Sequence, residues 1–142
     1  MFGRRRKEES YQDVAFVDPG PTPQEWGDVA RELAERAGRV AGDPEAILIV
    51  EIADSDAYTQ WLGMAGGSLH CEASSQTTEE QNRQLAELGW RPPVKRGPDP
   101  TVNWNRGWVA PVDAAEVARL TVHTLRLVYG AQPSQIRFNV VQ

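Results

Sequence analysis

Three short strand-forming segments follow one another between residues 46 and 73, and they constrain the fold more than any other part of the chain. The first, Ala46-Ile47-Leu48-Ile49-Val50-Glu51-Ile52, is a continuous apolar run rich in β-branched residues, typical of a strand covered on both or nearly both faces. We expect it to be the central strand. Turn residues at 54–56 and 66–67 separate it from residues 58–62 and 69–73. Short turns between three strands predict an antiparallel meander.

Capping signals predict one helix before the meander and two after it. Thr22-Pro23-Gln24-Glu25 places Thr at the N-cap and Pro at the first helical position, and Gly42-Asp43-Pro44 ends this helix. Thr77-Thr78-Glu79-Glu80 opens a second, short helix by the same capping-box pattern. Asp113 opens a third helix over residues 114–129, and Gly130 closes it.

Two further strands complete the prediction. Residues 101–109 alternate in the manner of a strand, broken at Gly107, and Ile136, Phe138 and Val140 alternate as an edge strand would. Strands grouped between helices, rather than in strict alternation with them, favour the α+β class. We therefore predict an antiparallel sheet of about four to six strands packed with three helices.

The second predicted helix ends within residues 85–93, a segment that we call the joint. Gly89 can adopt the left-handed backbone conformation without a Cβ penalty, and the next residue then folds back onto the last turn. Trp90 is therefore predicted to pack against Leu85. The double proline that starts at Pro92 then prevents the helix from continuing. The joint is predicted to be structural, without catalytic chemistry of its own.

Length and charge set the broad class. At 142 residues the chain fits one domain, for which we expect residues 22–142, preceded by a flexible arm at residues 1–21. A net charge of −5 argues against a nucleic-acid partner, because phosphate binding needs a basic surface. No apolar run approaches the roughly 20 residues that a membrane-spanning helix needs, nor is there a signal-peptide pattern. We expect no membrane association and a cytoplasmic location.

Catalytic and metal-binding residues are sparse. His70, Cys71 and Glu72 are neighbours on one predicted strand, so Cys71 points to the face opposite the other two and the three cannot converge on one ion. Cys71 could in principle be paired with the distant His123 as nucleophile and base, but two such residues carry little specificity without known geometry. We expect no metal site, no cofactor and no catalytic site.

The five tryptophans are the one compositional excess. Trp26 falls on the apolar stripe of the first helix, and the others fall on the sheet and the joint. Each is by default a core residue, yet the set exceeds what a small core needs, so we expect one or two to border exposed apolar surface. The predicted peptide-binding residues are Trp61, Leu69, Trp104 and Trp108.

A longer motif carries a family resemblance. Leu85, Leu88, Gly89, Trp90 and Pro92 are followed by Asn103-Trp104, and then by Thr124-Leu125-Arg126-x-Val128-Tyr129-Gly130 with Pro133. This pattern resembles actinobacterial TY-Chap-type domains, which are grouped with the type III secretion chaperones (CesT) and the YbjN family. The motif residues Leu85, Leu88, Gly89, Trp90, Pro92 and Asn103 are expected to be structural. The resemblance implies a small, often dimeric, non-enzymatic protein that holds client segments in extended form.

The resemblance and the residues together predict a peptide- or protein-binding chaperone-like module. Binding would use apolar patches and pairing at a sheet edge. Either the basic N-terminal arm or the C-terminal strand could cover the client surface. Two alternatives remain at this point: a purely structural subunit whose apolar face is consumed in a homodimer, and, less favoured, a small enzyme that uses Cys71 and His123.

Overall fold

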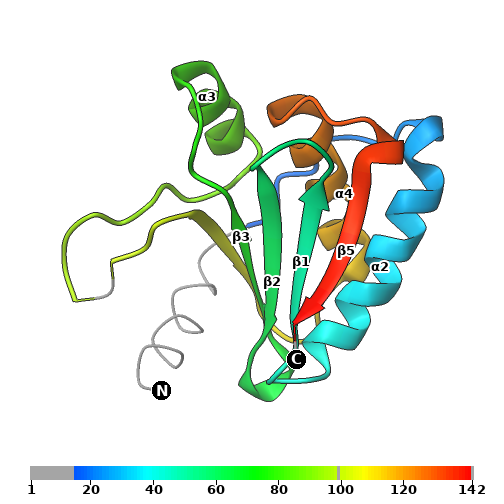
Figure 1. Cartoon of the computed structure of the whole chain (residues 1–142). Coiled ribbons are helices and arrows are strands. Elements are labelled where there is room, and N and C mark those ends of the chain that lie inside the picture. Colours follow the sequence, from blue (N-terminus) through cyan, green and yellow to red (C-terminus); the bar gives the residue numbers. More distant parts are fainter. Residues whose placement is uncertain (1–14, 99, 142) are drawn as a thin grey trace.

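The computed structural model describes residues 15–98 and 100–141, which form a five-stranded antiparallel sheet with its main helices on one face (Figure 1). The predicted α+β class is confirmed. In chain order the elements are η1 (Gln24–Trp26), α2 (Gly27–Ala41), β1 (Ile47–Ile52), β2 (Tyr58–Gly63), η2 (Ala65–Gly67), β3 (Leu69–Ala73), α3 (Glu79–Glu87), β4 (Trp104–Trp108), α4 (Ala114–His123), η3 (Thr124–Val128), η4 (Pro133–Gln135) and β5 (Ile136–Val141).

The strand order across the sheet is β4-β3-β2-β1-β5. The predicted meander of β1, β2 and β3 is confirmed, and β4 and β5 are added at its two sides. The prediction that residues 46–52 form the central strand is wrong, because β2 occupies the centre and β1 lies next to the β5 edge. Strand β1 is also less covered than expected. Leu48, Val50 and Ile52 on one face are buried, whereas Glu51 on the other face is exposed.

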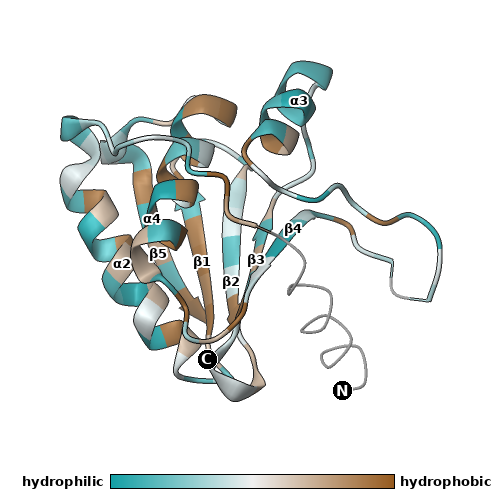
Figure 2. Ribbon diagram, turned by 180° about the vertical axis from the view of Figure 1, so that it is seen from behind, coloured by the Kyte–Doolittle hydropathy of each residue, from teal (hydrophilic) through white to brown (hydrophobic). Residues whose placement is uncertain are grey.

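The register divides the sheet into two faces. Leu48 lies opposite Trp61, Trp61 opposite Cys71, and Cys71 opposite Arg106, so these side chains project from one face. Helices α2 and α4 lie over this face, which we call the covered face (Figure 2). The other, open face carries Ile49, Gln60 and the side chains in register with them. In the described part of the chain no helix lies over β1, β2 and β5 on this side (Figure 1).

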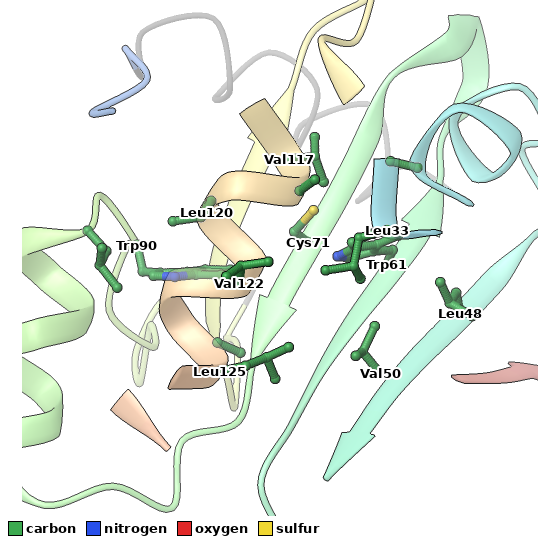
Figure 3. Close-up of a cluster of buried hydrophobic side chains, with 14 of the residues drawn as sticks. Leu33, Leu48, Val50, Trp61, Cys71, Trp90, Val117, Leu120, Val122 and Leu125 are labelled. Atoms are coloured by element: carbon green, nitrogen blue, oxygen red, sulfur yellow. The ribbon is translucent and has the colours of Figure 1, made fainter. Parts of the chain in front are cut away.

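One apolar core fills the space between the covered face and the helices. Leu33 from α2, Trp61 from β2 and Val117 from α4 converge there, each exposed by 1% or less (Figure 3). At the end of β2 a helix-to-sheet approach is so close that only glycine fits. A Cβ on Gly63 would overlap the carbonyl oxygens of Val40 and Asp43. Val40 lies in the last turn of α2, and Asp43 follows that helix. The glycine-rich segment 63–67 is thus both a packing contact and the predicted turn.

The helix starts follow the capping signals with small shifts. The first helical segment begins as the 3-10 turn η1, whose N-cap is Pro23 rather than the predicted Thr22 and has no side-chain capping bond. In α3 the cap is Thr78: its side chain accepts from the Gln81 backbone N–H, while Gln81 accepts from the Thr78 N–H at 2.8 Å. Asp113 caps α4 as predicted, through bonds of 3.1 and 3.2 Å to its first turn.

The C-terminal half also differs from the prediction in detail. The predicted third helix is α4 followed by a π-helical turn, in which the Tyr129 N–H donates to the Thr124 carbonyl at 3.3 Å. Strand β4 runs unbroken through Gly107, which pairs with His70. Strand β5 is the predicted edge strand. Of the predicted arm, residues 1–14 lie outside the described residues, whereas residues 15–21 pack against the domain.

Candidate functional site

The four residues predicted to bind peptide all lie on the covered face. Trp61 and Leu69 are 0% exposed, Trp104 is 7% exposed and Trp108 is 6% exposed. Their strand parity directs them toward α2 and α4 rather than toward solvent. In this conformation they cannot contact a bound peptide, and a client surface must be sought among other residues.

The joint has the predicted geometry. Gly89 has a φ of 97°, the Trp90 N–H donates to the Leu85 carbonyl at 3.0 Å, and the Gly89 N–H donates to the Ala86 carbonyl at 3.1 Å. These two bonds define a Schellman motif, the expected helix ending at a left-handed glycine. Trp90 is buried in the same core as Leu85 and Leu88, and its Nε1 donates to Thr124 Oγ1 at 2.9 Å. Pro92 follows on the surface.

Asn103, expected to be structural, organises a polar network on the open face. Its Nδ2 donates to the Tyr58 hydroxyl and to Glu72 Oε1, both at 3.0 Å. The other carboxylate oxygen, Glu72 Oε2, lies 2.9 Å from His70 Nε2. Residues from three different segments are thereby held together. The sequence showed His70 and Glu72 on one strand face, but it gave no signal for their link to Asn103 and Tyr58.

Cys71 and His123 do not have the properties of a nucleophile and its base. Burial raises the pKa of the Cys71 thiol far above its ordinary value, so the thiol stays protonated at neutral pH. Both ring nitrogens of His123 are engaged: Nε2 with the Gly20 carbonyl at 3.2 Å, and Nδ1 with Arg126 Nη1 at 3.1 Å. Burial lowers the pKa of His123. Among the described residues, no hydrogen bond or ion pair joins the Cys71 and His123 side chains.

Residues 15–21, which we call the strap, cross the domain beside β4. The Phe16 ring lies 5.3 Å from the Trp108 ring, and Asp18 Oδ1 lies 3.4 Å from Arg119 Nε. Arg106, only 1% exposed, donates from Nη1 to the carbonyls of Ala15 and Gly89 at 3.3 and 3.4 Å. Burial lowers the pKa of Arg106. No pattern in the sequence predicts that an arginine is buried here.

At the opposite side of the sheet, β5 is an edge with exposed apolar side chains. Val140 is 51% exposed and Val141 is 38% exposed. Nearby, a shallow cavity of about 540 Å³ opens on the open face where β1 and β2 are joined. Its lining combines apolar and polar groups from β1, β2, their turn and β5: Ile49, Glu51, Tyr58, Gln60 and Arg137 are among them.

Comparison with known proteins adds a family to this geometry. A family model described as "T3SS (YopN, CesT) and YbjN peptide-binding chaperone 3", TY-Chap3, matches residues 20–141. The chain belongs to the TY-Chap3 family. The match confirms the family resemblance of the motif around Gly89, but not the actinobacterial origin that accompanied it. No curated protein and no solved structure matches the chain.

The TY-Chap3 match spans every helix and strand of the sheet domain, while residues 15–19 of the strap precede it. Within the described residues, no three histidine, cysteine, aspartate or glutamate side chains gather in a way that could hold a metal ion. Among the same residues, every helix is too short or too polar to cross a bilayer. The described surface of this TY-Chap3 domain includes the β5 edge with exposed apolar side chains, the open face with its mixed lining, and the strap.

Proposed function

We propose that this TY-Chap3 domain is a non-enzymatic module that binds an extended peptide or protein segment along the β5 edge and the adjoining open face. The observation that carries the proposal is an edge strand with solvent-exposed apolar side chains in a domain of a peptide-binding chaperone family. An extended segment can add to such an edge through main-chain hydrogen bonds, while alternate side chains enter apolar surface.

The hydrogen-bond pattern identifies which backbone groups of β5 face outward. The Ala53 N–H donates to the Gln135 carbonyl at 2.8 Å, next to the β1–β5 ladder. Because hydrogen-bonded pairs alternate in an antiparallel ladder, Arg137 and Asn139 bond to β1, and Phe138 and Val140 direct their N–H and C=O groups away from it. Those outward groups are the ones that a client strand would meet.

The open face supplies the side-chain part of the interaction. Ile47, Ile49 and Leu62 are half-buried on this face, in register across β1 and β2. They form an apolar strip next to the 540 Å³ cavity, where Glu51 and Arg137 provide charge of both signs. A client with alternating apolar side chains could place one of them in the cavity while its backbone pairs with β5.

Proline substitution tests edge pairing directly. Val140→Pro removes one outward N–H without removing a bond to β1, so the fold is expected to persist. Fluorescence anisotropy with labelled ten-residue peptides of alternating valine and threonine should show binding to the parent and loss of binding, by tenfold or more, in Val140→Pro. The matched control Val140→Ala keeps the N–H and should bind within about threefold of the parent.

Equal affinities for Val140→Pro and Val140→Ala would contradict edge pairing. Absence of binding to any extended peptide, tested on an array of varied composition, would contradict the peptide-binding function as a whole. Circular dichroism and a thermal melt of each variant establish that a lost signal reflects binding rather than unfolding.

The same edge favours a second candidate, a homodimer in which two β5 strands pair about a twofold axis. The exposed Val140 and Val141 would then be covered by the second copy. Light scattering at micromolar concentration should give twice the monomer mass for the parent and the monomer mass for Val140→Pro. A monomeric parent would eliminate this candidate and leave the β5 edge available to a client.

A further inference from the structure

The strap lies against a surface, which we call the groove, that three separate parts of the domain create. Strand β4 supplies Trp108 and Arg106, the joint supplies Gly89, and α4 supplies Arg119. Gly89 matters here because it has no side chain: a Cβ on this residue would lie 3.8 Å from Val17 Cγ2 and 3.3 Å from Arg106 Nη1. The groove is on the far side of the sheet from β5, beside the β4 edge.

Phe16 and Asp18 of the strap make different kinds of contact with the domain. Phe16 packs on Trp108 between two guanidinium groups, with Arg106 and Arg119 at 5.8 and 5.6 Å from its ring centre. Two residues later, the Asp18 carboxylate faces Arg119 at 3.4 Å. The groove therefore recognises an aromatic side chain followed two positions later by a negative charge.

The strap leaves part of this groove unsatisfied. Arg106 is buried, yet among the described residues no carboxylate lies within ion-pair distance of it. Its Nε has no hydrogen-bond acceptor there, and the Nε of Arg119 faces Asp18 without the geometry of a hydrogen bond. Glu116 acts on Arg106 and on Arg119 from beyond ion-pair distance. A carboxylate of a bound acidic segment at ion-pair distance from Arg106 would add an interaction that the strap does not supply.

The strap itself is held by few and long contacts. Its backbone joins no strand ladder, its hydrogen bonds to the described part of the domain are 3.2 to 3.3 Å long, and Val17 is 50% exposed. The Asp18 side chain is 60% exposed, so its attraction to Arg119 is screened by solvent. A segment of this kind can leave the groove without breaking the sheet or a helix.

We propose that the groove under the strap is a second peptide-docking site, which residues 15–20 occupy within the same chain, and that an acidic segment with an aromatic residue followed two positions later by a carboxylate displaces them. The inference builds on the proposed peptide-binding function, but it concerns the β4 side of the sheet and does not require the β5 edge. The strap then competes with such clients for the groove, so a client must be present at a higher concentration to occupy it.

Hydrogen exchange on the full-length protein tests displacement without any substitution. The probe is the peptide Glu-Val-Ala-Tyr-Val-Glu-Pro-Gly, which has the proposed pattern and a mass different from that of the strap. At millimolar concentration it should increase deuterium uptake at residues 16–20 and decrease uptake at residues 104–108. A control peptide with Ala for Tyr and Gln for each Glu should change neither. Unchanged uptake in the strap with the probe would overturn the proposal.

A strap variant tests the competition quantitatively. In Phe16→Ala/Asp18→Asn the groove loses its internal occupant, so the fluorescently labelled probe should bind at least tenfold more tightly than it binds the parent. Adding Arg119→Gln should remove the preference for glutamate over glutamine at the second position after the tyrosine, which a purely structural role of Arg119 would leave intact. Equal affinity of parent and strap variant would overturn the proposal.

The two proposed sites can fail separately. Val140→Pro should leave binding of the Tyr-Val-Glu probe unchanged, whereas the strap variant should leave binding of the valine–threonine peptides unchanged. If the parent binds only the valine–threonine peptides, the strap site is incorrect. If the parent binds only the Tyr-Val-Glu probe, the β5 site is incorrect. Retention of a cooperative thermal transition in each variant shows that the domain remains folded.

Discussion

The two faces of the sheet differ although their residues alternate along the same strands. Trp61 and Leu62 are sequence neighbours on β2. Trp61 is fully buried in the core between the sheet and the helices (Figure 3). Leu62 is half-buried on the open face. The covered face contains three of the five tryptophans, Trp61, Trp104 and Trp108. The open face contains smaller aliphatic side chains, and it adjoins the β5 edge. Large aromatic side chains thus fill the core of the domain, and smaller apolar side chains remain accessible to solvent on the open face.

The largest expected effect compares these two neighbours directly. Trp61→Ala should lower the free energy of unfolding by about 3 to 5 kcal/mol, because it removes a large side chain from a dry core and leaves a cavity. Leu62→Ala should cost about 1 kcal/mol, since solvent already reaches that side chain. Urea denaturation of both variants measures the difference. Similar losses would show that the open face is as tightly packed as the covered one.

Gly63 tests how closely α2 lies against the covered face. Gly63→Ala should destabilise by about 3 kcal/mol, because the new methyl group overlaps two backbone carbonyls that cannot easily move. Gly38→Ala is the matched control: it lies on the exposed side of α2 with no atom near the added Cβ, and it should stabilise by about 0.5 to 1 kcal/mol. An unchanged thermal midpoint for Gly63→Ala would contradict this packing.

The stability of the domain at alkaline pH tests how completely the Tyr129 hydroxyl is buried. Burial raises the pKa of Tyr129 to about 12, and its hydroxyl donates to the Ser74 carbonyl at 2.7 Å. The unfolded chain releases this proton near pH 10 while the folded chain retains it, so stability should fall between pH 10 and 12, by roughly 2 to 3 kcal/mol. The stability difference between parent and Tyr129→Phe isolates this effect, because other titrating groups cancel. A pH-independent difference would contradict it.

The smallest expected effect concerns the joint beneath the strap. Gly89→Val should destabilise by roughly 1 to 3 kcal/mol, because a β-branched residue is forced into a left-handed conformation. The added side chain also crowds Arg106 and Val17. Chemical denaturation gives the stability, and hydrogen exchange at residues 15–20 reports on the strap. Equal stability of variant and parent would show that the Schellman ending contributes little.

The local elements could be predicted because their causes are local. Asp113 and Thr78 cap helices with acceptors that are adjacent in sequence, and Gly89 ends α3 through bonds to the preceding turn. The meander followed from short turns, and the family motif marked the same joint. The position of β1 was missed, because nothing in residues 46–52 records that β5 returns to pair beside them.

The functional surface was harder to predict than the fold. Trp61, Leu69, Trp104 and Trp108 were predicted to bind peptide, but the sequence could not say that helices α2 and α4 would cover the sheet face on which all four lie. The network around Asn103 and the burial of Arg106 depend on residues far apart in the chain. Such contacts leave no periodic signal in any one segment.

By itself, the sequence determined the kinds of element, their order, the helix endings and the family, because hydrogen-bonding geometry and side-chain periodicity act over a few residues. Only the tertiary structure decided which sheet face is dry, where β5 pairs and where the strap lies. These outcomes depend on the mutual packing of α2, α4 and the sheet, in which buried area and close contacts such as that at Gly63 select one arrangement from several that the local pattern allows.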